Sequence, residues 1–139
     1  MRTALLILLL CASCHASTRL VFAQDTPGEA MQSVVRAIAV YSSAGAKLPC
    51  KIRIVWDTRG AVVPFGWYAA TFRRNGRWTI AINAHDMYWP RWEISLDRIF
   101  LHEIGHTLGW MHEPADSVME SPIYEHLTQS DLARIGGSK

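Results

Sequence analysis

The sequence predicts a single α+β domain, in which strands and helices alternate along the chain. Three observations carry this prediction. Residues 51–56 alternate between apolar and polar side chains, as expected of a half-buried strand. Asn75-Gly76 separates two further apolar segments and favours the type I′ turn of a β-hairpin, which needs positive φ at both central residues. Between residues 29 and 41, apolar side chains recur at spacings of three and four, the period of an amphipathic helix.

Composition restricts the class of protein. The length of 139 residues fits one domain, and a hydrophobic content of 50% excludes an intrinsically disordered chain. The formal net charge is +2 without a run of Lys or Arg, so we predict no nucleic-acid partner. Three cysteines are too few for a disulfide scaffold. We expect a small globular monomer.

Residues 1–16 are predicted to be a secretory signal peptide. Arg2 supplies a short positive start, and the apolar segment 4–12 has the length of a signal core. This segment is too short for a transmembrane helix, which needs about 20 apolar residues. The mature protein would then be residues 17–139, with 13 Lys and Arg against 12 Asp and Glu. We expect it to be extracellular, or periplasmic in a bacterium.

The cleavage point has three candidates. Cleavage after Ala16 is favoured because it keeps the next alternating segment in the mature domain. Cleavage after Ala23 also meets the small-residue rule, with the signal then extending to that residue. Lipidation at Cys14 is a third and weaker alternative. Cys50 pairs with Cys14 or stays unpaired, and we favour an unpaired, buried Cys50 before a strand.

The first part of the domain is predicted to form a strand, a helix and three more strands. Residues 18–24 alternate and form the first strand, and the helix at 29–41 ends before Gly45 and Pro49. The later strands are expected at 51–56, 67–72 and 78–83. The buried stripe of the helix is expected to contain Met31, Val34, Val35, Ile38 and Ala39.

The second part is predicted to form two helices. Ser95 is placed to cap a helix over 96–108, because its side chain can accept a hydrogen bond from a free backbone N–H of the first turn. Thr128 and Asp131 have the spacing of a capping box for a short last helix that ends at 136–137.

The segment from His102 to His112 indicates a metal site. His102 and His106 are four residues apart, so both imidazoles project from one helix face and can bind the same ion. Gly109 ends the helix and lets the chain turn, which makes His112 a third ligand. Three neutral imidazoles suit a catalytic Zn²⁺ with an open position for water. Glu103, beside the first ligand, is then placed to act as general base.

This segment reads H-E-x-x-H-x-x-G-x-x-H and is followed by Ser117-Val118-Met119. In both features the chain resembles the metzincin clan of zinc peptidases. The resemblance implies a zincin-like fold, with a small twisted mixed sheet of four or five strands, an active-site helix and a short C-terminal lobe. It also implies that Met119 lies beneath the zinc, and that the chain is a secreted endopeptidase that hydrolyses peptide or protein substrates.

Within the clan, the chain resembles the catalytic domain of matrixins, the matrix-metalloproteinase family of peptidase family M10. Segment 66–72 is similar to the matrixin strand that pairs with substrate, which implies that the backbone at Tyr68 and Ala69 binds an extended peptide. Pro122 and Tyr124 resemble the wall of the pocket for the residue after the scissile bond. That resemblance implies a medium-to-large apolar side chain at this substrate position.

The chain also departs from the matrixin pattern. Ala70 stands where matrixins usually have a histidine for a structural zinc, and the Asn75-Gly76 hairpin replaces their longer metal-binding loop. We therefore expect one catalytic zinc, without structural zinc or calcium. Two other interpretations stay open, a non-catalytic zinc module that binds protein or glycan, and a peptidase confined to short peptides. The presence of Glu103 favours an enzyme over the first of these.

Overall fold

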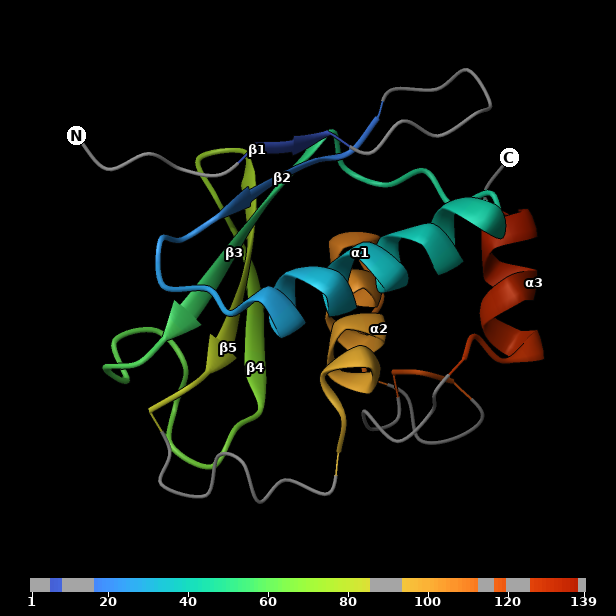
Figure 1. The fold of residues 1–139 in the computed structure, drawn as a ribbon. Coiled ribbons are helices and arrows are strands. Elements are labelled where there is room, and N and C mark those ends of the chain that lie inside the picture. The colour runs from blue at the N-terminus through green and yellow to red at the C-terminus, as the bar shows by residue number, and fades with distance from the viewer. Residues whose placement is uncertain (1–5, 9–16, 86–93, 113–116, 120–125, 138–139) are drawn as a thin grey trace.

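A computed structural model of the chain describes residues 6–8, 17–85, 94–112, 117–119 and 126–137 (Figure 1). In these ranges it is a small α+β structure with one sheet and three helices. The strands are β1 (Leu6–Leu8), β2 (Arg19–Phe22), β3 (Lys51–Asp57), β4 (Ala69–Arg74) and β5 (Arg77–Asn83). The helices are α1 (Gly28–Ser43), α2 (Leu96–Thr107) and α3 (Gln129–Gly137).

The strands form one mixed sheet in the order β1-β2-β3-β5-β4. β2, β3 and β5 are parallel, whereas β4 runs antiparallel to β5 and β1 antiparallel to β2. The predicted α+β class and the presence of a small mixed sheet are confirmed. β1 lies inside the predicted signal peptide, so cleavage after Ala16 would leave a sheet of β2 to β5 with β2 at its edge.

The β4–β5 hairpin has the predicted turn. Asn75 and Gly76 have φ values of 50° and 73°, the left-handed conformation that a type I′ turn requires. β4 begins two residues later than predicted. The reason is a turn immediately before it, in which Gly66 has a φ of 81° and the Trp67 N–H donates to the Pro64 carbonyl at 3.2 Å.

The core lies between the sheet and the helices α1 and α2, which cover one face of the sheet (Figure 1). β3 buries Ile52 and Ile54 completely toward these helices, as its alternation predicts. In α1 the predicted burial of Val34 and Ile38 is confirmed, but Ala39 is exposed. The buried arc of α1 is instead completed by Ala30, Ser33, Ala37 and Tyr41.

The helix ends follow the predicted capping chemistry. The Ser95 hydroxyl accepts a hydrogen bond from the Arg98 N–H at 3.4 Å. At α3 the capping box is reciprocal, because the Asp131 N–H donates to the Thr128 hydroxyl at 3.2 Å and the Thr128 N–H donates to the Asp131 carboxylate at 2.9 Å. Among the described helices, none combines the length and the apolar character needed to cross a membrane.

The expectation of a buried Cys50 is wrong. Its side chain is exposed and its thiol is free. The backbone rather than the side chain holds this residue in place, because the Cys50 carbonyl accepts the Arg19 N–H at 2.9 Å and so continues the pairing of β2 with β3.

The loop after β3 is fixed by one buried carboxylate. Asp57 is 4% exposed and its carboxylate accepts four backbone N–H groups. The donors are Arg59 at 3.3 Å, Ala61 at 3.1 Å, and Val62 and Val63 at 2.8 Å each. Burial acts to raise the pKa of Asp57, but these hydrogen bonds outweigh it and lower the pKa below its ordinary value.

We predict that Asp57→Asn lowers the free energy of unfolding by about 1–3 kcal/mol at pH 7, because an amide cannot accept all four N–H groups. The folded-state pKa of Asp57 lies below its unfolded value, so its stabilisation is complete above about pH 4 and is lost as the pH falls through the folded value. Urea unfolding at pH 7 and pH 3 should therefore show a difference from wild type that shrinks in acid. Asp25→Asn, at an exposed position, is the control. An equal difference at both pH values would contradict this account.

Candidate metal centre

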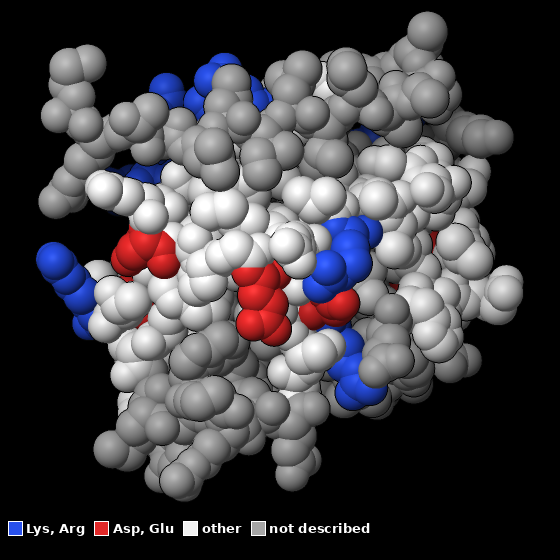
Figure 2. Space-filling model, viewed as in Figure 1, with Lys and Arg blue, Asp and Glu red and all other residues white. Residues whose placement is uncertain are grey.

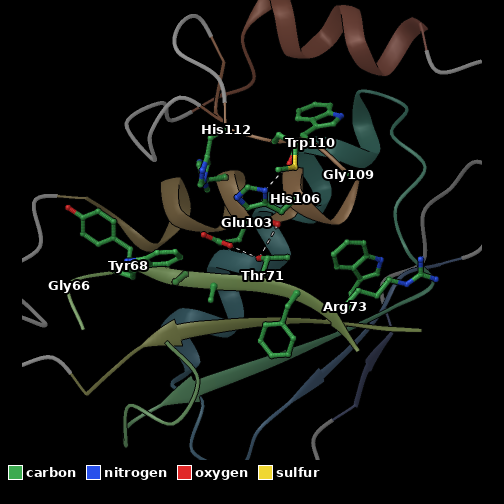
Figure 3. Close-up of a pocket in the computed structure, with 16 residues that line it drawn as sticks. Gly66, Tyr68, Thr71, Arg73, Glu103, His106, Gly109, Trp110 and His112 are labelled. Atoms are coloured by element: carbon green, nitrogen blue, oxygen red, sulfur yellow. Dashed lines mark hydrogen bonds between the residues drawn. The ribbon is translucent and has the colours of Figure 1, made fainter. Parts of the chain in front are cut away.

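Three histidines converge at the C-terminal end of α2 (Figure 3). His102 and His106 are one turn apart on α2. The chain then turns at Gly109, whose φ is 83°, and returns His112 to the same place. One ring nitrogen from each histidine lies within 4.8 Å of the others, and the Nε2 atoms of His102 and His112 are 3.1 Å apart. These three residues are close enough to bind one metal ion.

Backbone carbonyls fix the orientation of two of these rings. His102 Nδ1 lies 2.7 Å from the Val118 carbonyl, and His106 Nδ1 lies 2.8 Å from the Trp110 carbonyl. Because a carbonyl can only accept, each Nδ1 is the donor and each Nε2 is left with a lone pair. This is the arrangement by which proteins orient metal-binding histidines.

Burial keeps these imidazoles neutral. It lowers the pKa of His102 to about 4, although the hydrogen bond to the Val118 carbonyl acts in the opposite direction. The pKa of His106 is also lowered, again mainly by burial, with the Trp110 carbonyl opposing it. At neutral pH both rings are therefore ready to bind a cation without first losing a proton.

Glu103 places a carboxylate beside the three histidines. Glu103 is 6% exposed. The Thr71 hydroxyl of β4 donates to Oε2 of the Glu103 carboxylate (Figure 3). The same hydroxyl makes a longer contact of 3.4 Å with the Glu103 backbone carbonyl. Burial raises the pKa of Glu103 to about 7, and the hydrogen bond from Thr71 opposes this shift. The carboxyl is thus held in one place by a side chain of the edge strand.

The segment 117–119 is held by α3. The buried Asp131 carboxylate accepts the Ser117 hydroxyl at 2.6 Å and the Val118 N–H at 3.1 Å. Val118 in turn presents its carbonyl to His102, so α3 helps to fix the orientation of the His102 ring. Met119 is completely buried and belongs to the hydrophobic core.

The histidines and Glu103 face a cleft of about 800 Å³, bounded by β4 on one side and by residues 109–112 on the other. The Tyr68 carbonyl is already bonded to the Asn83 N–H of β5 at 2.9 Å. In an antiparallel ladder the backbone groups point alternately to either side. The N–H and C=O groups of Ala69 and Thr71 therefore point to the outer edge of β4, which is free of other strands among the described residues and where an extended chain could pair.

Two further predicted site residues, Pro122 and Tyr124, lie outside the described residues. The contact of Thr71 with Glu103 was not predicted from the sequence, and Asp131 was predicted only as a helix cap. Alternation along β4 could have shown that Thr71 points toward the helices, but its contact with Glu103 depends on how α2 packs against this strand.

A scan against protein-family models and a search of the curated proteins both gave no match for this chain.

Gly105→Ala should disturb the packing beneath the histidines. A Cβ at position 105 would overlap Sδ of Met119 and lie 3.1 Å from the Tyr41 hydroxyl and 3.2 Å from Cε3 of Trp110. We expect a loss of about 1–3 kcal/mol in the free energy of unfolding, measured by urea denaturation. Gly136→Ala is the control, because no heavy atom lies within 4 Å of its Cβ and alanine favours a helix. Unchanged stability of Gly105→Ala would show that the packing is looser than described.

The chain is predicted to bind one zinc ion in a titration followed by calorimetry. Removing one ligand with His106→Ala should weaken binding at least about a hundredfold. His126→Ala, an exposed histidine outside the cluster, should bind as the wild type does. Equal affinities for the two variants would contradict the assignment of the site.

Proposed function

We propose that this chain is a secreted zinc endopeptidase of the metzincin type, with a matrixin-like catalytic domain. The observation that carries the proposal is the position of Glu103. Its buried carboxylate lies beside three converging imidazoles and faces a cleft with a free strand edge. A site that only binds metal for stability has no need of this acid or this cleft.

The donor set fits zinc. Two nitrogens that each lie about 2.05 Å from a tetrahedral zinc are separated by roughly 3.3 Å. The Nε2 atoms of His102 and His112 are 3.1 Å apart, close to that separation. Three imidazoles without a thiolate are also the ligand type of catalytic rather than structural zinc. When bound there, zinc supplies a Lewis acid that polarises a peptide carbonyl and makes water more acidic.

Glu103 performs the proton transfers in this proposal. Its carboxylate accepts a proton from the attacking water and later delivers it to the amine that leaves. The Thr71 hydroxyl holds the carboxylate while both transfers take place. The low exposure of Glu103 limits competition from bulk solvent for the same proton.

The free edge of β4 positions the substrate. A peptide that pairs in extended form with Ala69 and Thr71 would lie along the cleft, with its backbone beside Glu103. Thr71 would then contribute twice, through its backbone to the substrate and through its side chain to the general base. In this proposal β4 has two roles, because it binds the peptide and also fixes the Glu103 carboxylate.

We predict that the zinc-loaded protein cleaves casein and that a zinc chelator abolishes the cleavage. Glu103→Gln keeps the size of the side chain but cannot accept the proton, so kcat should fall by about 10²–10⁴ while zinc stays bound. Cleavage is measured by release of labelled peptides. If the wild type binds one zinc and cuts no protein, the endopeptidase proposal fails. If Glu103→Gln cuts as well as the wild type, the role of Glu103 fails.

Thr71 is predicted to act as a positioning residue for Glu103. Thr71→Val removes the hydroxyl but keeps the branched shape, and we expect kcat to fall about tenfold with KM nearly unchanged. Thr71→Ser restores the hydroxyl and should recover most of kcat, which a purely structural role would not predict. Equal kcat values for the valine and serine variants would contradict this role.

A further inference from the structure

The sheet face opposite α1 and α2 carries a row of four cationic side chains. Arg19 of β2 is opposite Lys51 of β3, and Arg77 of β5 is opposite Arg74 of β4. The register between β3 and β5 places Lys51 beside Arg77. All four are exposed and alternate with residues that point to the helices. The row therefore crosses the four strands at one end, with about 5 Å between neighbouring strands.

Such a row is unfavourable unless an anion compensates for it. Like charges directly opposite each other destabilise a sheet. Asp57 lies on the same face of β3, but its carboxylate is buried and bonded to the following loop. On the α1 side, by contrast, acidic and basic side chains are interspersed (Figure 2). There Arg36 pairs with Asp97 at 2.8 Å.

A hollow of about 680 Å³ lies in this basic face. It is lined by Lys51, Arg74 and Arg77, and also by Arg53, the next residue of β3 on the same face. Among the described residues, no Asp or Glu lines it. Five of the 14 Lys and Arg residues, the four of the row and Arg53, thus gather on this face of the sheet.

We propose that this basic sheet face binds a linear sulfated or carboxylated polysaccharide. The cations form a line across a hollow, which a linear polyanion can follow and a flat bilayer cannot enter. Arginine, which dominates the row, matches sulfate and carboxylate oxygens with paired N–H donors. Single-stranded nucleic acids use several exposed aromatic stacking partners, but the described residues of this hollow include two aromatic side chains, of which Phe72 is exposed and Trp78 is half-buried. The predicted export signal would bring the protein to such glycans.

The surface is separate from the proposed peptidase site. Lys51, Arg74 and Arg77 do not line the cleft that holds the three histidines. They also remain in the mature chain whether cleavage occurs after Ala16 or Ala23. The polysaccharide would therefore localise the protein without occupying the cleft.

The test uses a fluorescent heparin octasaccharide, whose binding to the whole protein is followed by anisotropy. Arg77→Glu should weaken binding at least about tenfold, because one charge-assisted contact is replaced by repulsion. Arg59→Glu makes the same change of charge at an exposed residue that does not line the hollow, and it should bind nearly as the wild type does. Arg77→Glu should keep wild-type zinc binding and stability because it relieves repulsion within the row. If this variant unfolds, Arg77→Gln takes its place with the same expected direction.

Three outcomes would overturn the proposal. Equal weakening by Arg77→Glu and Arg59→Glu would show that binding follows only net charge. No binding of the octasaccharide at low salt would exclude a glycan at this face. Tighter, Arg77-dependent binding of an eight-nucleotide single-stranded DNA or of phosphatidylserine vesicles would assign the face to another polyanion.

Discussion

The convergence of the three histidines depends on two backbone carbonyls. Those of Val118 and Trp110 accept from the Nδ1 atoms of His102 and His106 and so aim both Nε2 atoms at one point. Much of the C-terminal part of the structure positions the first carbonyl. Asp131, at the start of α3, binds the backbone of Val118 and is itself fixed by the capping box. The short helix α3 thereby fixes the orientation of a histidine on another element.

The sheet has two faces with different chemistry. One face is covered by α1 and α2, and the Tyr41 hydroxyl joins these helices by donating to the Leu101 carbonyl at 2.8 Å. α2 in turn packs against β4, which brings Thr71 to Glu103. The opposite face carries cations in register across four strands. The order of the strands thus places Thr71 beside Glu103 on one face of the sheet and brings the cationic side chains together on the other.

Local chemistry was predictable from the sequence, and tertiary placement was not. The spacing of His102 and His106 on one helix, the caps and the hairpin turn depend on neighbours in sequence, and the structure agrees with them. The contact of Thr71 with Glu103 depends on the packing of α2 beneath an edge strand. The cationic row depends on strand order and register, which alternation alone does not determine. Burial of Cys50 was predicted wrongly because its backbone, not its thiol, joins the sheet.

Zinc K-edge X-ray absorption on the loaded protein tests whether His102, His106 and His112 form a metal centre with one position left for water or substrate. The spectrum should show three imidazole nitrogens and one oxygen at about 2.0–2.2 Å. A sulfur at about 2.3 Å would mean that a cysteine binds the metal instead. That result, or an unchanged spectrum in His106→Ala, would contradict the account.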